Sequence, residues 1–235
     1  MDKMKVVICA GPPTSGKTTV LKQVAQRLMG KGYSLAYLKI DVQYADEDEL
    51  FREKFGIPAK KIYSGDLCPD HCTVVVLGDA IKWGKEDNSD VLFVETAGLC
   101  LRCSPYIESS LGIVVLEATS RMNLPRKIGP MLSLADIAVV TKMDLVSQAE
   151  REGFRANINE AAKIPIIETD ALHGINIDQV VRKIEGMQEI KEPLVLRGNP
   201  PLGVCTICVG IKEIGWEKHF GVVRTLDTDL FYKGQ

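Results

Sequence analysis

The chain has 235 residues, of which 46% are hydrophobic and 26% charged, a balance typical of soluble globular proteins. Its 29 basic and 31 acidic residues give a formal net charge of −2. This near-neutral balance, with no long block of one charge, argues against a nucleic-acid-binding surface or a basic membrane patch and favours small molecules or proteins as partners. No apolar run approaches the roughly 20 residues of a membrane span, and we expect a cytoplasmic protein.

Six short apolar segments, rich in Val and Ile, predict buried strands. In chain order they read KVVICA, SLAYLKI, DVLFVE, LGIVVLEA, ADIAVVTK and IPIIET. Apolar residues at helical spacing predict a helix from about Lys17 to Met29 and another around 177–184. The segment TVVVLGDAIKWGKE begins like a strand and continues like a helix, so both assignments stay open. Strands that alternate with helices indicate an α/β fold, with a mostly parallel sheet and helices on both faces.

The alternation ends near residue 190, where Pro193, Gly198, Pro200 and Pro201 interrupt it. We therefore expect a main domain over residues 1–190 and a C-terminal extension over 191–235. The extension is too short for a core of its own, so we expect it to pack on the main domain or to be fastened by a metal.

The stretch AGPPTSGKTT lies between a predicted strand and a predicted helix and predicts a phosphate-binding loop. Gly11, four further residues and then Gly16-Lys17-Thr18 make the full GxxxxGK[ST] pattern of a P-loop. The glycines let backbone amides close around phosphate, Lys17 reaches the β and γ oxygens, and Thr18 offers its hydroxyl to Mg²⁺. The expected nucleotide-binding residues here are Gly11, Thr14, Ser15, Gly16, Lys17, Thr18 and Thr19.

Two strand ends supply carboxylates to this loop. Glu95 ends an apolar strand in VLFVETAG, where it can hold magnesium or its water, and Gly98 can offer its amide to the γ-phosphate. Asp41 closes SLAYLKID and is a second magnesium-side carboxylate, with a solvated strand-end acid as the alternative. Lys17, Asp41 and Glu95 are therefore the expected catalytic residues, and Thr18, Asp41 and Glu95 the expected magnesium ligands.

The run VVTKMDL predicts a loop that reads the base. Asp144 can accept hydrogen bonds from N1 and N2 of guanine, while the stem of Lys142 lies on the ring. Adenine has no such donor pair, so the motif favours GTP over ATP. Thr141 stands where such motifs usually carry Asn.

The cysteines suggest a metal. Six of the 7 fall into close pairs, and in a reducing compartment this spacing favours metal ligands over disulfides. The pairs are Cys68 and Cys72, Cys100 and Cys103, and Cys205 and Cys208. Cys9 lies in the apolar run VVICA and is expected to behave as a small hydrophobic residue.

These motifs together resemble the nickel-insertion GTPases of the CobW/HypB/UreG type, which include the urease accessory and hydrogenase maturation GTPases. The similarity runs in the family's order from residue 5 to about 187, through GPPTSGKTT, KID, CPDHC, ETAG, NLPRKIGPMLSLADIAVVTKMDLV and ETDALHGINIDQV. The resemblance implies that Asp170, Ala171 and Leu172 form the last guanine-contacting loop. It also implies a GTP-dependent homodimer that binds a metal ion between its protomers and releases it on nucleotide turnover.

The resemblance places the metal motif at Cys68-Pro69-Asp70-His71-Cys72, which differs from the family's Cys-Pro-His by one inserted residue and one added cysteine. The candidate ligands are Cys68, His71 and Cys72. An added thiolate suits Zn²⁺, Cu(I) or an iron–sulfur centre as well as Ni²⁺.

The pair Cys205/Cys208 lies outside what the resemblance explains. Joined to Cys100 and Cys103, it would make a tetrahedral thiolate site or hold a four-iron cluster, and it would fasten the extension to the loop that senses the γ-phosphate. Two half-sites completed across a dimer, and structural or redox cysteines, are the alternatives.

The sequence therefore predicts a P-loop GTPase that serves as a metallochaperone or maturation factor for a client metalloenzyme and hydrolyses GTP slowly without metal or partner. An iron–sulfur protein that uses nucleotide to deliver electrons or a cluster is the main rival. An ATP-dependent small-molecule kinase is a weaker one, since no convincing lid is visible.

Overall fold

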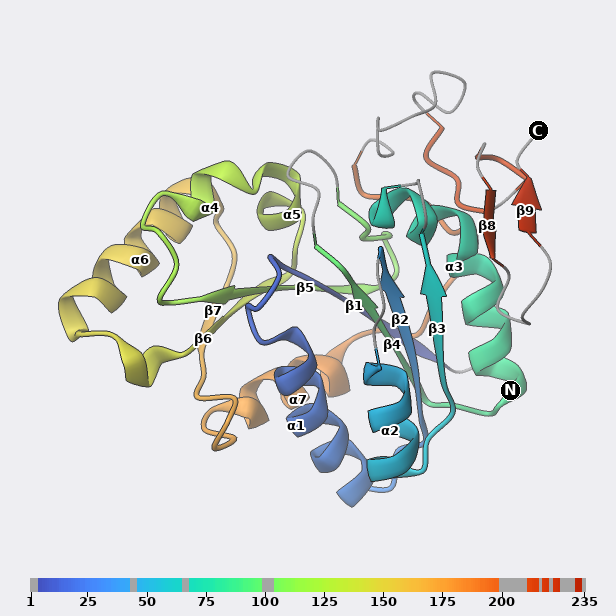
Figure 1. The fold of residues 1–235 in the computed structure, drawn as a ribbon, viewed down its shortest axis with the longest axis horizontal. Helices are drawn as coiled ribbons and strands as arrows, with labels where there is room; N and C mark the ends of the chain where they lie inside the picture. Colours follow the sequence, from blue (N-terminus) through green and yellow to red (C-terminus); the bar gives the residue numbers. More distant parts are fainter. Residues whose placement is uncertain are drawn as a thin grey trace.

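The computed structural model describes residues 4–42, 46–64, 68–98, 104–198, 211–215 and 217–219, and the backbone of 222–224 and 231–233. A seven-stranded sheet lies at its centre, in the order β3-β2-β4-β1-β5-β6-β7, with every pairing parallel (Figure 1). The strands are β1 (Lys5–Ala10), β2 (Leu35–Asp41), β3 (Ala59–Tyr63), β4 (Val91–Thr96), β5 (Leu111–Glu117), β6 (Ile137–Thr141) and β7 (Ile166–Glu168). The predicted parallel α/β fold is confirmed.

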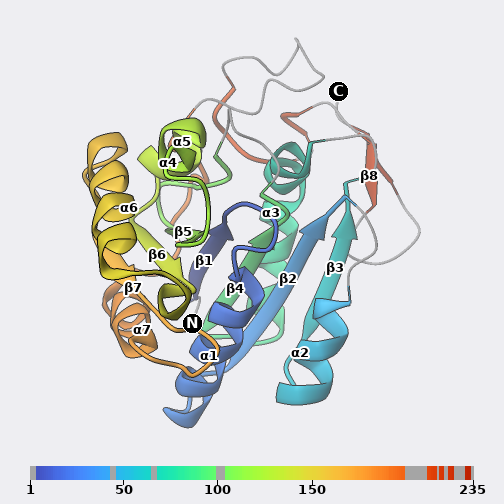
Figure 2. The same cartoon turned by 60° about the vertical axis from the view of Figure 1, so that its left-hand side comes forward.

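Helices cover both faces of this sheet, as Figures 1 and 2 show from two directions. One face carries α1 (Lys17–Gly30), α2 (Glu47–Phe55) and α7 (Ile177–Gly186). The other carries α3 (Pro69–Glu86), α4 (Leu124–Lys127), α5 (Gly129–Ser133) and α6 (Gln148–Ala161). Alternate strand residues supply the two apolar cores: Val7 and Cys9 pack on the α1 side, Val6 and Ile8 on the α3 side. Because both faces are buried, the strands are apolar almost throughout.

The periodic helices form as predicted. The buried face of α1 includes Val20, Leu21, Val24 and Leu28, and that of α7 consists of Ile177, Val180, Val181 and Ile184. The segment left ambiguous by its sequence is the helix α3. It begins with Pro69 in its first turn, where a missing N–H costs nothing, and its β-branched run is buried against the sheet.

Several elements were not predicted, α2 and β3 among them. The helix α2 is rich in charge, and only Phe51 and Asp48 are buried on it. The strand β3 carries two lysines at the edge of the sheet. Both lack the apolar pattern on which the prediction of strands and helices depended, because elements at the edge of a sheet bury only a few of their side chains.

The parallel arrangement brings the carboxyl ends of the strands to one edge of the sheet. The loop after β1, Asp41 at the end of β2, Glu95 near the end of β4 and Thr141 at the end of β6 therefore meet there. A short 3₁₀ helix, η1 (Met143–Leu145), follows β6. This edge holds most of the residues that the sequence singled out for nucleotide chemistry.

The described parts of the C-terminal extension lie against the main domain. The N–H of Glu108 donates to the carbonyl of Val195 at 2.9 Å, and the N–H of Gly215 donates to the carbonyl of Val74 at 3.0 Å. The Arg197 guanidinium donates to three main-domain carbonyls and pairs with Asp136 at 2.7 Å. Farther on, β8 (Val222–Arg224) and β9 (Phe231–Lys233) pair antiparallel.

None of the helices in the described part of the chain combines the length and the apolar character that crossing a bilayer requires.

Candidate functional site

The loop from Gly11 to Gly16 joins β1 to α1 and depends on glycine at both ends. Gly11 and Gly16 have φ angles of +147° and +93°, which L side chains rarely adopt. A Cβ atom on Gly11 would lie 2.2 Å from the carbonyl oxygen of Val115, so a larger residue would push the loop off β5. Gly16 caps α1, whose first amides open toward the loop and make it suitable for an anion.

Lys17 is buried at the start of α1. Its Nζ donates to the carbonyls of Gly11 and Pro12, at 2.9 and 3.0 Å. Burial lowers the pKa of Lys17, an effect that the nearby charge of Glu95 partly offsets. The ammonium group thus lies inside the loop that the sequence predicted to hold phosphate.

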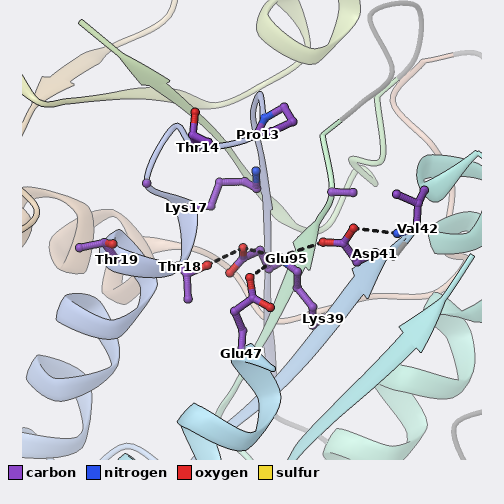
Figure 3. Close-up of a pocket in the computed structure, with 12 residues that line it drawn as sticks. Pro13, Thr14, Lys17, Thr18, Thr19, Lys39, Asp41, Val42, Glu47 and Glu95 are labelled. Atoms are coloured by element: carbon purple, nitrogen blue, oxygen red, sulfur yellow. Dashed lines mark hydrogen bonds and ion pairs between the residues drawn. The ribbon is translucent and has the colours of Figure 1, made fainter. Parts of the chain in front are cut away.

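Glu95 is the centre of the hydrogen-bond network beside this loop (Figure 3). It is 1% exposed, and both of its carboxylate oxygens are engaged. Oε1 accepts from Thr18 Oγ1 at 2.8 Å and from Lys39 Nζ at 2.8 Å, while Oε2 accepts from the Tyr37 hydroxyl at 2.8 Å. Residues from α1, β2 and β4 are therefore fixed to one carboxylate.

Lys39 was missed by the sequence analysis, although a lysine inside the apolar strand SLAYLKI was the available signal. Its side chain is 4% exposed, and its Nζ also lies 3.1 Å from Glu47 Oε1 and 3.5 Å from Asp41 Oδ2. Burial alone would lower the pKa of Lys39, but the charges of Glu95 and Glu47 outweigh it and raise the pKa above its ordinary value. Lys39 is therefore charged.

The network borders a pocket of about 600 Å³ whose oxygen atoms suit magnesium. The pocket is lined by Pro13, Thr14, Gly16, Lys17, Thr18, Thr19, Lys39, Asp41, Val42, Glu47, Glu95 and Ala97. The hydroxyl of Thr18 and the carboxylates of Asp41 and Glu95 are hard oxygen donors, the type that Mg²⁺ takes. These three predicted ligands lie together and fit the ion, which when bound would neutralise charge on the β and γ phosphates.

Gly98 lies directly on the phosphate loop. Its φ is +70°, and a Cβ atom there would come within 1.6 Å of the carbonyl oxygen of Gly11. No side chain fits between these two backbone segments. The loop after β4 is therefore in contact with the phosphate loop, as expected for a segment that senses phosphate.

A second pocket, of about 300 Å³, lies beside the first and shares Gly16 and Thr19 with it. Its other lining residues are Thr141, Lys142, Asp144, Leu145, Asp170, Ala171 and Leu172. The structure thus brings together all the residues proposed for base recognition. Lys142 adopts a left-handed conformation, with φ of +57°, and pairs with Glu117, which fixes the turn between β6 and η1.

Thr141, the departure from the usual Asn, has a defined structural role. Its buried Oγ1 donates to the carbonyl of Ser15 at 2.6 Å and lies 3.3 Å from that of Leu116. The hydroxyl therefore ties the base-side strand β6 to the phosphate loop.

Asp170 organises the last loop of the base pocket. Its Oδ1 accepts from the backbone N–H groups of Leu172 and His173, both at 3.1 Å, and its Oδ2 lies 2.5 Å from His173 Nδ1. This pairing lowers the pKa of Asp170 and raises that of His173. Ala171 is buried at the pocket wall, while Leu172 is 75% exposed.

Within one protomer, Cys68, His71 and Cys72 do not form a metal site; the predicted site lies between two protomers. Cys72 and His71 are buried in the first turns of α3, and Cys72 belongs to the apolar core. Burial raises the pKa of Cys68 and Cys72, which disfavours the thiolate that binds metal. Within the described ranges, no three His, Cys, Asp or Glu side chains are grouped to hold a metal ion. The cause is the helical fold of the motif, which turns Cys72 inward.

The C-terminal extension reaches this motif through His219. The rings of His71 and His219 meet edge to face, with centroids 5.9 Å apart, and His219 Nε2 lies 2.7 Å from the carbonyl of Glu213. Burial lowers the pKa of His219. The predicted cysteine ligands Cys100, Cys103, Cys205 and Cys208 lie outside the described residues.

The chain is similar to known proteins over most of its length. The family described as CobW/HypB/UreG, nucleotide-binding domain, matches residues 5–167. An uncharacterized protein of Methanocaldococcus jannaschii is 43% identical over 235 residues, which cover 99% of this chain and 100% of the relative. The urease accessory protein UreG 2 of Streptomyces griseus is 26% identical over 205 residues, which cover 80% of this chain and 90% of the relative.

Two solved structures share the fold. The hydrogenase maturation factor HypB of Archaeoglobus fulgidus matches with a TM-score of 0.63 and 22% identity, over 79% of this chain and 90% of that one. HypB of Helicobacter pylori, solved in complex with nickel, matches with a TM-score of 0.64 and 21% identity, over 81% of this chain and 92% of that one.

Proposed function

The chain belongs to the CobW/HypB/UreG family of nucleotide-binding domains, and on this premise we propose that it binds and hydrolyses GTP to deliver a thiophilic metal ion to a client metalloenzyme. Support comes from the relatives, a urease accessory protein and hydrogenase maturation factors, one of them in complex with nickel. Ni²⁺ or another thiophilic ion is the cargo in this account, while Mg²⁺ is the cofactor.

One observation carries the nucleotide part of the proposal: the phosphate pocket and the base pocket share Gly16 and Thr19. A nucleotide whose phosphates lie against Lys17 can therefore place its base beside Asp144 and Lys142. The Asp144 carboxylate accepts two hydrogen bonds from guanine and meets only acceptor or C–H edges on adenine. GTP is thus the preferred substrate.

The residues of the phosphate pocket have distinct tasks. Lys17 neutralises the β and γ oxygens, and Gly98 offers its amide to the γ-phosphate. The magnesium ion would be held by Thr18, Asp41 and Glu95. No arginine lines the phosphate pocket in the described part of the chain. We therefore expect turnover to stay slow until metal, client or a second copy completes the site.

Calorimetry with GDP and ADP tests the nucleotide assignment. We expect GDP to bind at least about tenfold more tightly, since an Asp144 carboxylate left without its donors costs more than about 1.4 kcal/mol. Asp144→Ala should erase this preference, whereas Asp178→Ala, which removes an exposed carboxylate on α7, should preserve it. Equal affinities in the unmodified protein would remove guanine recognition from the proposal.

For the cargo metal, we propose a homodimer in which the first turns of α3 from two protomers supply the ligands, chiefly Cys68 and His71. One chain alone does not gather three ligands among its described residues, so a second copy would supply the remainder. Light scattering should show a larger dimer fraction with a GTP analogue and Ni²⁺ than with GDP and Ni²⁺. Cys68→Ala should abolish that difference, and an unchanged mass in every state would refute the dimer.

An iron–sulfur protein is the second candidate, because six cysteines occur as close pairs in the sequence. Protein purified without oxygen would then be brown and lose its colour with any of Cys100, Cys103, Cys205 or Cys208 replaced by Ser. Colourless protein that contains no iron eliminates this candidate.

A further inference from the structure

Three carboxylates surround a single ammonium group in the phosphate pocket. Lys39 Nζ lies 2.8 Å from Glu95, 3.1 Å from Glu47 and 3.5 Å from Asp41. Figure 3 shows these side chains converging from β2, α2 and β4. Counting one charge for each group, the four side chains sum to −2.

Lys39 lies beside the oxygen atoms that would bind a divalent cation. The Glu95 oxygen that accepts from Lys39 also accepts from the hydroxyl of Thr18, at 2.8 Å in both cases. The other Glu95 oxygen is taken by the Tyr37 hydroxyl. A cation that binds Thr18 and Glu95 therefore approaches the Lys39 ammonium closely.

Like charges at such short range repel strongly where water is largely excluded, and Lys39 is 4% exposed. Without Lys39, the Glu95 carboxylate and the Thr18 hydroxyl would be available to a hard divalent cation, and the charges of Asp41 and Glu47 nearby would attract it with no nucleotide present. With Lys39 in place, the same oxygens are already neutralised in part. A bound phosphate group adds the negative charge that offsets the repulsion.

We propose that Lys39 is a built-in counter-cation that keeps the magnesium site closed to free divalent cations until the nucleotide's phosphates arrive. This inference rests on the proposed function, because it assumes that the cation binds together with a nucleoside triphosphate. Glu47, which belongs to α2, remains as a partner for the ammonium when Glu95 turns to the cation. Lys39 is thus a positioning residue that makes metal binding conditional on nucleotide.

A purely structural role for Lys39 makes a different prediction. If the lysine only compensates the buried charge of Glu95, its replacement lowers stability and leaves the site weak for cations. Cation affinity measured without nucleotide therefore separates the two roles. Because no nucleotide is present, the result is also independent of whether the protein prefers GTP, so failure here and failure of the GTPase proposal are distinguishable.

The experiment titrates Mn²⁺ into the full chain, freed of nucleotide, and follows the electron paramagnetic resonance signal of free Mn²⁺. Lys39→Gln removes the charge and keeps a donor for Glu95, which favours folding, and Lys39→Met is the second neutral variant. Lys39→Arg keeps the charge. The double variant Lys39→Gln with Glu95→Gln shows whether the binding measured is at this site rather than at the cysteines.

We expect weak Mn²⁺ binding in the unmodified protein and in Lys39→Arg, and at least about tenfold tighter binding in a folded neutral variant. The double variant should lose the gain. The proposal is overturned if neutral variants bind Mn²⁺ no more tightly than the unmodified protein, if Lys39→Arg gains affinity equally, or if the gain survives loss of Glu95. Circular dichroism identifies which neutral variant is folded, and the Mn²⁺ affinity of that variant is the one compared with the unmodified protein.

Discussion

Replacing Thr141 with Val tests whether the base-side strand holds the phosphate loop in place. Valine has nearly the same shape, so the change removes the hydroxyl without a cavity. The Thr141 hydroxyl donates to the Ser15 carbonyl at 2.6 Å in a residue that is 2% exposed, so a buried acceptor loses its partner. Such a loss costs about 1–3 kcal/mol, which at an m-value of about 3 kcal/mol/M should lower the urea midpoint by about 0.3–1 M. Because Ser15 belongs to the phosphate loop, GDP affinity should also fall about five- to tenfold by calorimetry.

A matched control separates this tether from general stability. Tyr106 is also buried, and its hydroxyl lies 3.2 Å from the carbonyl of Ile113 and 3.1 Å from that of Met131, while Tyr106 lines neither pocket. Tyr106→Phe should lower stability and leave GDP affinity unchanged, whereas Thr141→Ser should restore both properties. Equal GDP affinities for Thr141→Val and the unmodified protein would refute the tether.

Three further predictions concern the loops around the site. Gly98→Ala would place a Cβ atom 1.6 Å from the carbonyl oxygen of Gly11, so the loop after β4 must move. The ratio of the affinities for a GTP analogue and for GDP, measured by calorimetry, should fall at least about fivefold. An unchanged ratio would contradict the role of this contact. Pairing with Asp170 raises the pKa of His173, so the ion pair between them stabilises the last loop of the base pocket. This stabilisation is fully present below the ordinary histidine pKa of about 6.5 and is lost as the pH rises through the raised pKa. GDP affinity should therefore decline with rising pH in that window, and His173→Gln should flatten the profile. Arg197→Ala removes three hydrogen bonds to the main domain, so the free energy of unfolding from urea titrations should fall by about 2–4 kcal/mol and the chain after residue 190 should be cleaved faster by protease. Arg155→Ala is the control, because its exposed ion pair with Glu168 at 3.6 Å contributes little to stability.

The fold and the grouping of the candidate nucleotide residues around two pockets could be predicted because their signals are local. Buried parallel strands are apolar runs, and the phosphate loop is a continuous stretch whose glycines are dictated by backbone geometry. Glu95, Asp41 and Asp144 could be placed as well, since parallel strands bring their carboxyl ends to one edge. Each of these inferences needs only the chain near the residue concerned and the general topology.

The missed features depend on contacts between distant elements. Lys39 reads as an anomaly in an apolar strand until β4 and α2 bring Glu95 and Glu47 to it. Cys72 reads as a ligand until α3 continues through the motif and turns its thiol into the core. Spacing along the sequence identifies possible ligands, but the backbone conformation decides which of them face one another.

The coupling of nucleotide state to metal binding is the centre of the account, and one measurement tests it directly. Ni²⁺ affinity of the full chain, measured by competition with a coloured chelator, should be compared with a Mg²⁺–GTP analogue and with Mg²⁺–GDP. We expect the triphosphate state to bind Ni²⁺ at least about tenfold more tightly, a coupling of about 1.4 kcal/mol, and Cys68→Ala to remove the difference. Equal Ni²⁺ affinities in the two nucleotide states would contradict the proposal that nucleotide turnover delivers the metal.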